Sequence, residues 1–427
     1  MTKNAAYHSP LVQNAIGATL PRLKRADGVW LYDESGKNYI DGCSGAVVAN
    51  IGHSHPRVLF AMQEQAANVT YAHRAAFSTQ QQLDLASRLA ELTGFAGVWF
   101  VNSGSEAVEA TLQIALQYHK ERGESRSYFV SHQTSYHGNT LGALSLSDHA
   151  RRSVIQGTAM TTGQLKSPYV DDYSVEQLLE EAEHFILKSS KPIAGILFEP
   201  VSGATLSARP LHDGYLQGLR KLCDRFGILL IADEVMTGLG RTGKTLASEH
   251  WSVKPDLVAL GKGMGAGYTP IAAALLSEKV LNVLADGSGK ILGGHTYGGN
   301  PLSVAVADEV LKITIEEDLI AASDSQGAYL RELLEDLEKS YPLLISAVHG
   351  LGLLQGVTLK RADQSAAIGT VAEQLRVACL HHGLIIYPAT GGFNDSFIVA
   401  PPLNSSRAEI EELVRRLDEG MSSLEEK

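Results

Sequence analysis

Two short aliphatic runs, each followed by a charged residue, constrain the fold of this chain most strongly. The run at 228–232 is followed by Asp233, and the run at 257–260 is followed by Gly261 and Lys262. Runs of this length are too short for helices and are typical of buried strands in a parallel sheet. Ligands of open α/β sheets bind outside the carboxyl ends of the strands, so we expect both charged side chains to point into one crevice.

The two charged residues form a chemically specific pair. A carboxylate can keep a pyridinium nitrogen protonated, and a lysine amine can form a Schiff base with an aldehyde. Pyridoxal 5'-phosphate (PLP) requires both groups. Asp233 and Lys262 are therefore the first candidates for catalytic residues of a PLP site.

Composition limits the remaining classes of protein. A chain of 427 residues suits two or three domains, and 44% hydrophobic with 19% charged residues is typical of a folded globular protein. The net charge of −11 argues against nucleic acid or an anionic membrane as a partner. The N-terminus has no apolar signal segment, and no apolar run is long enough to span a membrane. The three cysteines, Cys43, Cys223 and Cys379, are too few and too scattered to form a disulfide framework. We therefore expect a cytoplasmic protein.

The order of patterns along the chain predicts two lobes. Residues 28–40 have hairpin character, and residues 56–310 alternate between helical and short strand patterns, as βαβ units do. One helix–strand unit can be predicted completely: an amphipathic helix at 214–226 ends at Gly227, and a strand follows directly. After residue 310 a helical, charged stretch precedes segments rich in glycine and aliphatic residues, which predicts a small α+β domain.

Two further motifs suit a planar, phosphorylated ligand. Ser103, Gly104 and Ser105 lie where a predicted strand turns into a helix, and the free amide groups and dipole of a helix start favour a phosphate. An ordinary serine N-cap explains the same pattern. Tyr136 follows a predicted strand, where its ring could stack on a cofactor or be an ordinary core tyrosine.

Two other patterns have competing interpretations. Residues 238–245 match the P-loop pattern, including Lys244 and Thr245, but a P-loop joins its strand directly to a helix, and the strand that carries its aspartate comes later in the chain. Here the Asp233 strand comes first, so nucleotide binding is the less favoured alternative. No metal site is expected, because the histidines have neither the spacing of metal ligands nor carboxylates beside them. These histidines are His53, His55, His132, His381 and His382.

Taken together, these motifs resemble the class III (subgroup II) aminotransferases of PLP fold type I, in family order from about residue 25 to 405. The matching elements are Gly52-His53 with Pro56, Asn102 to Glu109, Tyr136-His137-Gly138, Glu199-Pro200, Asp233-Glu234-Val235, Gly240 to Gly243, Pro255-Asp256, Lys262-Gly263, Thr296 to Pro301, and Pro401-Pro402-Leu403. The resemblance implies a large domain (56–310) with a mixed, mostly parallel sheet flanked by helices. It also implies a small α+β domain built from both termini, 1–55 and 311–427.

The resemblance also implies the roles of single residues. Lys262 would bind PLP as a Schiff base and move the proton between substrate and cofactor, while Asp233 would pair with the pyridinium nitrogen. The other cofactor-binding residues would be Ser103, Gly104 and Ser105 at the phosphate, Tyr136 stacked on the ring, His137, Glu199 beside Asp233, and Thr296. Thr296 would reach the phosphate of a neighbouring subunit, so a homodimer would be the smallest active unit.

The sequence departs from the family pattern where many members bind a substrate carboxylate. Ile398 stands where they have an arginine, Ala204 where they have the glutamate that shields it, and Tyr387 where amine:pyruvate relatives have a mobile arginine. Met236 replaces a glutamine near the cofactor hydroxyl. We therefore expect an apolar donor site for a primary amine or ω-amino compound, with pyruvate as the acceptor and a ping-pong cycle. Arg74 is a candidate carboxylate partner, although a surface arginine explains it as well.

Three functions thus stay open from the sequence. The first is a transaminase of the amine or ω-amino acid:pyruvate type. The second is a PLP-dependent lyase, racemase or mutase of the same family. The third is the P-loop nucleotide-binding protein.

Overall fold

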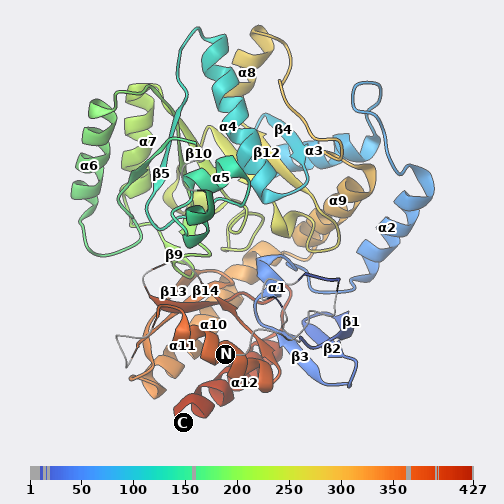
Figure 1. Cartoon of the computed structure of the whole chain (residues 1–427). Helices are drawn as coiled ribbons and strands as arrows, with labels where there is room; N and C mark the ends of the chain where they lie inside the picture. Colours follow the sequence, from blue (N-terminus) through green and yellow to red (C-terminus); the bar gives the residue numbers. More distant parts are fainter. Residues whose placement is uncertain are drawn as a thin grey trace.

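The computed structural model describes residues 10–12, 16, 20–155, 160–361, 367–389, 392 and 394–425. Its ribbon shows a larger lobe, with a central sheet between helices, next to a smaller lobe that holds the first strands and the last helices (Figure 1). The exact domain limits at residues 55 and 310 stay a prediction.

A seven-stranded sheet forms the centre of the larger lobe. Its order is β4 (Gly97–Val101), β12 (Ala272–Leu276), β11 (Leu257–Leu260), β10 (Leu229–Asp233), β7 (Ile193–Phe198), β5 (Tyr128–His132) and β6 (Thr162–Leu165). Strand β12 runs antiparallel to its two neighbours, and the remaining pairs are parallel. The predicted α/β fold with a mixed, mostly parallel sheet is confirmed.

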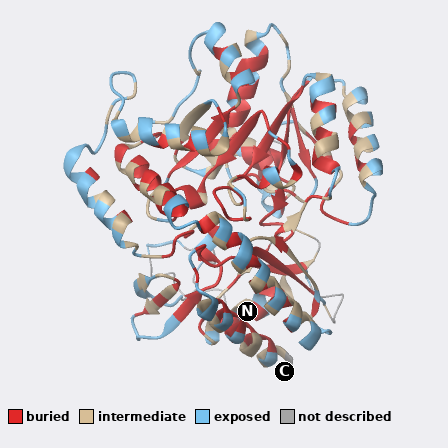
Figure 2. Cartoon of the chain, turned by 180° about the vertical axis from the view of Figure 1, so that it is seen from behind, coloured by how far each residue is buried: buried red, intermediate tan, exposed pale blue. Residues whose placement is uncertain are grey.

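Helices cover both faces of this sheet, and the strands lie buried between them (Figure 2). Side chains alternate across a strand, so the neighbours Leu230 and Ile231 join different hydrophobic clusters. The cluster on one face includes α4 (Gly104–Glu121), α5 (Leu141–Leu146) and α8 (Glu278–Asp286). The cluster on the other includes α3 (Gln80–Thr93), α6 (Val175–Lys188), α7 (Tyr215–Phe226) and α9 (Pro301–Glu316).

Helix α7 and strand β10 form the unit that the sequence predicted in full. The apolar face of α7 buries Leu216, Leu219 and Cys223. Gly227 ends the helix with φ of 66°, a left-handed conformation that glycine adopts without steric cost. The next strand begins two residues later and ends at Asp233, so the short connection places that carboxylate at the carboxyl edge of the sheet.

The smaller lobe contains two four-stranded sheets. The first has the order β1 (Leu23–Asp27), β2 (Trp30–Asp33), β3 (Asn38–Asp41) and β15 (Leu384–Ile385). The second has the order β13 (Ile345–Leu351), β14 (Leu354–Leu359), β17 (Asp395–Val399) and β16 (Tyr387–Pro388). The smaller lobe also contains the helices α10 (Leu319–Ser340), α11 (Thr370–His381) and α12 (Arg407–Glu425). Strands β3 and β15 pair in parallel, so segments from both ends of the chain share one sheet.

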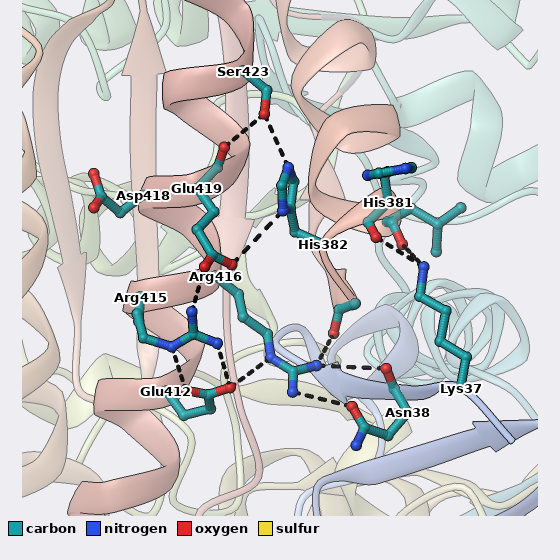
Figure 3. A network of polar contacts seen from close by, with 12 residues as sticks. Lys37, Asn38, His381, His382, Glu412, Arg415, Arg416, Asp418, Glu419 and Ser423 are labelled. Carbon is teal, nitrogen blue, oxygen red and sulfur yellow. Dashed lines mark hydrogen bonds and ion pairs between the residues drawn. The ribbon is translucent and has the colours of Figure 1, made fainter.

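A polar network also joins the two ends of the chain (Figure 3). Arg416 in α12 donates to the Gly383 carbonyl at 2.8 Å and to Asn38 Oδ1 at 3.0 Å. Glu412, one turn earlier on the helix, accepts from Arg416 Nε at 2.8 Å. The guanidinium thus ties the last helix to β3 and to the turn that precedes β15.

The remaining elements connect these layers. They are α1 (Ser44–Val47), α2 (Pro56–Asn68), β8 (Val201–Ser202), β9 (Arg209–Pro210), and three 3₁₀ helices, η1 (Ala150–Ile155), η2 (Ala247–Trp251) and η3 (Lys262–Met264). Among the described residues, no helix combines the length and the apolar character that crossing a lipid bilayer requires.

Candidate active site

One cavity lies at the carboxyl ends of the parallel strands, and most of the predicted site residues line it. They are Ser103, Gly104, Ser105, Tyr136, His137, Glu199, Asp233 and Lys262. Asp233 is the last residue of β10, and Lys262 opens η3 two residues after β11. Because β10 and β11 are parallel neighbours, with Asp233 opposite Ala259, their ends place both side chains at one edge.

Lys262 has an unusual backbone conformation, with φ of 44°. The left-handed region is sparsely populated by residues other than glycine, asparagine and aspartate, and such conformations gather at functional sites. Its side chain is only partly exposed, toward the cavity. Burial lowers the pKa of Lys262 to about 8, although Asp233 and Glu199 act in the opposite direction. The amine is therefore far easier to deprotonate than an ordinary lysine.

Asp233 is held by two hydrogen bonds. His137 Nδ1 donates to Asp233 Oδ2 at 2.9 Å, and the Val235 amide donates to Oδ1 at 3.1 Å. The His137 ring is buried, and its Nε2 has no hydrogen-bond partner in the part of the chain that the structure describes. The ring therefore fixes the orientation of the carboxylate inside the cavity.

Glu199 follows β7 and lies on the same side of the site. Its two carboxylate oxygens accept from the amides of Tyr136, at 3.1 Å, and Gly203, at 3.0 Å. Burial raises the pKa of Glu199 to about 7; His137 lowers it and Asp233 raises it. Glu199 thus holds the backbone of the tyrosine that the sequence singled out, while His137 contacts Asp233 directly.

The start of α4 has the shape of an anion cradle. Ser103 caps the helix by accepting from the Glu106 amide at 3.2 Å, and the first amides of any helix have no partner inside it. A Cβ added to Gly104 would come within 2.6 Å of Val235 Cγ1. Gly138, which the sequence analysis left without a role, has φ of +126°, and a Cβ there would lie 2.6 Å from Ser105 Oγ.

These features fit PLP. Free helix amides beside two glycines, where a Cβ would close the space, suit the phosphate. A buried carboxylate fixed by histidine suits the pyridinium nitrogen, and an amine with a lowered pKa suits the aldehyde. Tyr136 lines the same cavity, as a ring that stacks on the cofactor must.

Thr296 lies elsewhere. It is an exposed residue at the start of the turn 296–299 and does not line the cavity of its own chain. Arg74 is also outside the cavity: its guanidinium stacks over Trp99 at 4.3 Å, and it donates to the His295 carbonyl at 3.4 Å.

The positions that depart from the family pattern lie close to the site. Ala204 and Met236 line the cavity. Ile398 is fully buried in β17, where it pairs with Tyr387 of β16. The part of the cavity wall that Ala204 and Met236 form is therefore apolar, and Ile398 and Tyr387 do not line it.

The P-loop alternative does not agree with the local structure. Residues 238–245 form turns, and the 3₁₀ helix η2 follows them where a P-loop needs an α-helix. Arg241 within this segment is fully buried and donates to the carbonyls of Leu353, at 3.0 Å, and Pro401, at 2.5 Å. The segment thus has a structural role.

The three cysteines are free and buried, as inert thiols are.

The fold and the cavity together define a PLP enzyme of fold type I. The sequence profile described as "Aminotransferase class-III" matches residues 12–421. The chain therefore belongs to the class III aminotransferases, and like them it is a PLP-dependent aminotransferase.

Several relatives and solved structures resemble the whole chain. An uncharacterized aminotransferase of Bacillus subtilis, YodT, is 39% identical, with 98% of each chain covered. The mitochondrial ornithine aminotransferase of Arabidopsis thaliana is 33% identical, covering 91% of this chain and 78% of its own. An amine transaminase from an uncultivated Pseudomonas species, solved in its PLP-bound (internal aldimine) form, is 30% identical with a TM-score of 0.89, covering 98% and 99% of the chains. A transaminase from the marine bacterium Virgibacillus has the same TM-score at 28% identity, covering 96% and 94%.

Proposed function

We propose that this aminotransferase takes the amino group from a primary amine or ω-amino compound and passes it to pyruvate. The observation that carries the proposal is the cavity wall: Val201, Ala204, Val235 and Met236 line it, and no arginine does among the described residues. An apolar wall favours an uncharged donor group, whereas a fixed arginine would favour a carboxylate. The similar proteins include an ornithine aminotransferase and an amine transaminase, which supports an amine donor.

The chemistry divides between the cofactor and the chain. When bound, PLP supplies a carbonyl that reacts with amines and a ring that withdraws electrons from the substrate carbon. Lys262 Nζ would hold the cofactor and then carry the proton, since an amine with a pKa of about 8 can both accept and release it near neutral pH. Asp233 would keep a proton at the pyridine nitrogen, with His137 orienting the carboxylate.

The remaining residues would bind the cofactor without moving protons. The amides of Gly104 and Ser105, at the start of α4, would bind the phosphate, with Ser103 fixing the helix start. Tyr136 would pack on the ring, and Glu199 holds the Tyr136 backbone at 3.1 Å.

A homodimer would complete the site. Large aromatic side chains are exposed at the turn of Thr296, among them Tyr71 (44%) and Tyr297 (64%). The rings of Tyr297 and Tyr71 pack edge to face, with 6.2 Å between their centroids. Exposed aromatic groups of this kind are typical of surfaces that a partner covers. We propose that a second copy covers them and receives Thr296 at its phosphate site. Sedimentation of the holoenzyme checks the assembly, and weaker PLP retention by Thr296→Ala checks the contact.

The experiment that tests the substrate proposal follows the cofactor absorbance through each half of the cycle. Holoenzyme is mixed with 1-phenylethylamine, 4-aminobutyrate or alanine without a keto acid, and then with pyruvate or 2-oxoglutarate. We expect the visible band to bleach with an amine that lacks a carboxylate and to return at lower concentrations of pyruvate than of 2-oxoglutarate. If the band returns at lower concentrations of 2-oxoglutarate than of pyruvate, pyruvate is not the preferred acceptor. If no donor bleaches the band, the proposed donor class is wrong.

A further inference from the structure

The acceptor carries a carboxylate, and the cavity offers it little positive charge. Among the described residues that line the cavity, Lys262 is the only lysine or arginine, and it would be bound to the cofactor. Asp233 and Glu199 are acidic. Arg241 lies fully buried behind the site, with its two terminal nitrogens bonded to protein oxygens, including Asn50 Oδ1 at 2.8 Å. A keto acid therefore needs a cation from the mouth of the cavity.

Arg151 supplies a guanidinium at that mouth. It lies on the 3₁₀ helix η1, which follows α5, and its side chain is exposed. Its Nη1 is 3.3 Å from the hydroxyl of Tyr136, and its guanidinium carbon is 5.8 Å from the centre of that ring. Arg151 does not line the cavity itself, but Tyr136 does, so these two distances place the exposed guanidinium next to the cavity wall.

The charge of Arg151 also acts on a second tyrosine, Tyr387. Burial raises the pKa of Tyr387, and the positive charge of Arg151 lowers it in part, with Tyr136 and Cys43 also acting on it. Tyr387 is held in β16 against Ile398 of β17. Arg151 therefore contacts the hydroxyl of Tyr136, in the loop after β5, and its charge reaches the hydroxyl of Tyr387, in β16. A guanidinium next to a tyrosine hydroxyl is a suitable receptor for one carboxylate.

We infer that Arg151 binds the carboxylate of the keto-acid acceptor and is a specificity-determining residue of this enzyme. The inference rests on the proposed transamination to pyruvate and names the group that recognises the acceptor. Guanidinium matches a carboxylate with two parallel N–H donors, which a lysine cannot reproduce. A donor amine without a carboxylate makes no use of this contact, so one site serves both half-reactions.

The neighbouring arginine provides a matched control. Arg152 is adjacent in sequence and also lies on η1, but its Nη2 donates to Thr162 Oγ1 at 3.3 Å, on the edge strand β6. Neither arginine lines the cavity itself, but only Arg151 contacts the cavity-lining Tyr136. Arg151→Ala and Arg152→Ala therefore remove the same charge from the same helix, and only the first removes it from the mouth of the site.

The test compares two acceptors that differ by a carboxylate. Wild-type enzyme, Arg151→Ala, Arg151→Lys and Arg152→Ala are loaded with pyridoxamine phosphate and titrated with pyruvate or with acetaldehyde, following the return of the visible band. We expect Arg151→Ala to need about 10- to 100-fold more pyruvate, the loss typical of a charge-assisted hydrogen bond. Acetaldehyde and the donor half-reaction with 1-phenylethylamine should change less than about twofold, Arg151→Lys should fall between, and Arg152→Ala should resemble wild type.

The outcomes separate this inference from the function on which it rests. If Arg151→Ala uses pyruvate as wild type does, or loses pyruvate and acetaldehyde equally, the inference is wrong and transamination stands. If the visible band of the wild-type enzyme returns with acetaldehyde but not with pyruvate, the proposed acceptor is wrong. If wild-type enzyme responds to no amine and no carbonyl compound, the proposed function itself is wrong.

Discussion

The charge on Lys262 is controlled by opposing effects. Burial favours the neutral amine, and the carboxylates of Asp233 and Glu199 favour the charged one; the result is a pKa of about 8 against an ordinary value of 10.5. Only the neutral amine attacks the cofactor aldehyde.

The rate at which apoenzyme binds PLP covalently should therefore depend on pH in a specific way. Below the folded pKa the amine is protonated and the rate rises about tenfold per pH unit; above about pH 8 the rate should level off. Stopped-flow absorbance at a fixed PLP concentration measures it. A rate that continues to rise through pH 10 would mean that burial does not lower the pKa of this lysine.

Single residues differ in how far the sequence could predict them. Asp233 and Lys262 were predictable because each follows a short aliphatic run and has the chemistry of a PLP site. The contact between His137 and Asp233 was not, because 96 residues separate them and only the sheet order brings them together. Arg151 gave no pattern either, since its position depends on how η1 turns back over Tyr136.

Among the elements, the start of α4 has the most specific construction. Gly104 lies against Val235, where an added Cβ would be 2.6 Å from Cγ1, and Val235 also lines the cavity. The start of α4 and the segment that follows β10 can approach this closely only because residue 104 has no side chain.

Replacing Gly104 with alanine should therefore weaken cofactor binding. The added methyl forces Val235 or the helix start to move, which shifts the amides that would bind the phosphate. We expect the PLP dissociation constant of Gly104→Ala to rise by about tenfold or more, measured by titration of apoenzyme, because a change of 1.4 kcal/mol is tenfold in binding. The far-UV circular dichroism should stay that of wild type, and unchanged PLP affinity would argue against this phosphate site.

Elements with strong local signals were predicted closely. The α7–β10 unit matched because its amphipathic face, its terminal glycine and its aliphatic strand are all local in sequence. The reversed strand β12 was not assigned by residue, because aliphatic strands carry no sign of their direction. The pairing of β3 with β15 joins residues more than 340 positions apart, at Ile40 and Leu384, and no local pattern encodes it.

At the scale of the whole molecule, Arg241 connects segments that are distant in sequence. It is fully buried, and burial lowers its pKa to about 9. Its guanidinium contacts Asn50 near the N-terminal end, and Leu353 and Pro401 in the C-terminal part. The segment that resembled a P-loop thus stabilises the junction between the lobes.

Removal of this guanidinium should destabilise the protein. Arg241→Met leaves several buried oxygens without a donor, so we expect the free energy of unfolding to fall by about 3 kcal/mol in urea titrations. Arg415→Ala on the exposed face of α12 is the control and should cost less than about 1 kcal/mol, as surface ion pairs do. Equal effects would mean that the buried contacts contribute little.

Every step of the proposed reaction requires that Lys262 carries the cofactor. The most direct measurement is to reduce the purified holoenzyme with borohydride, digest it, and locate the phosphopyridoxyl group by mass spectrometry. We predict that the group is on Lys262 in the wild-type protein, and that Lys262→Ala carries none and does not cycle between amine and pyruvate. A label on another lysine, or full activity of Lys262→Ala, would contradict the assignment of the active site.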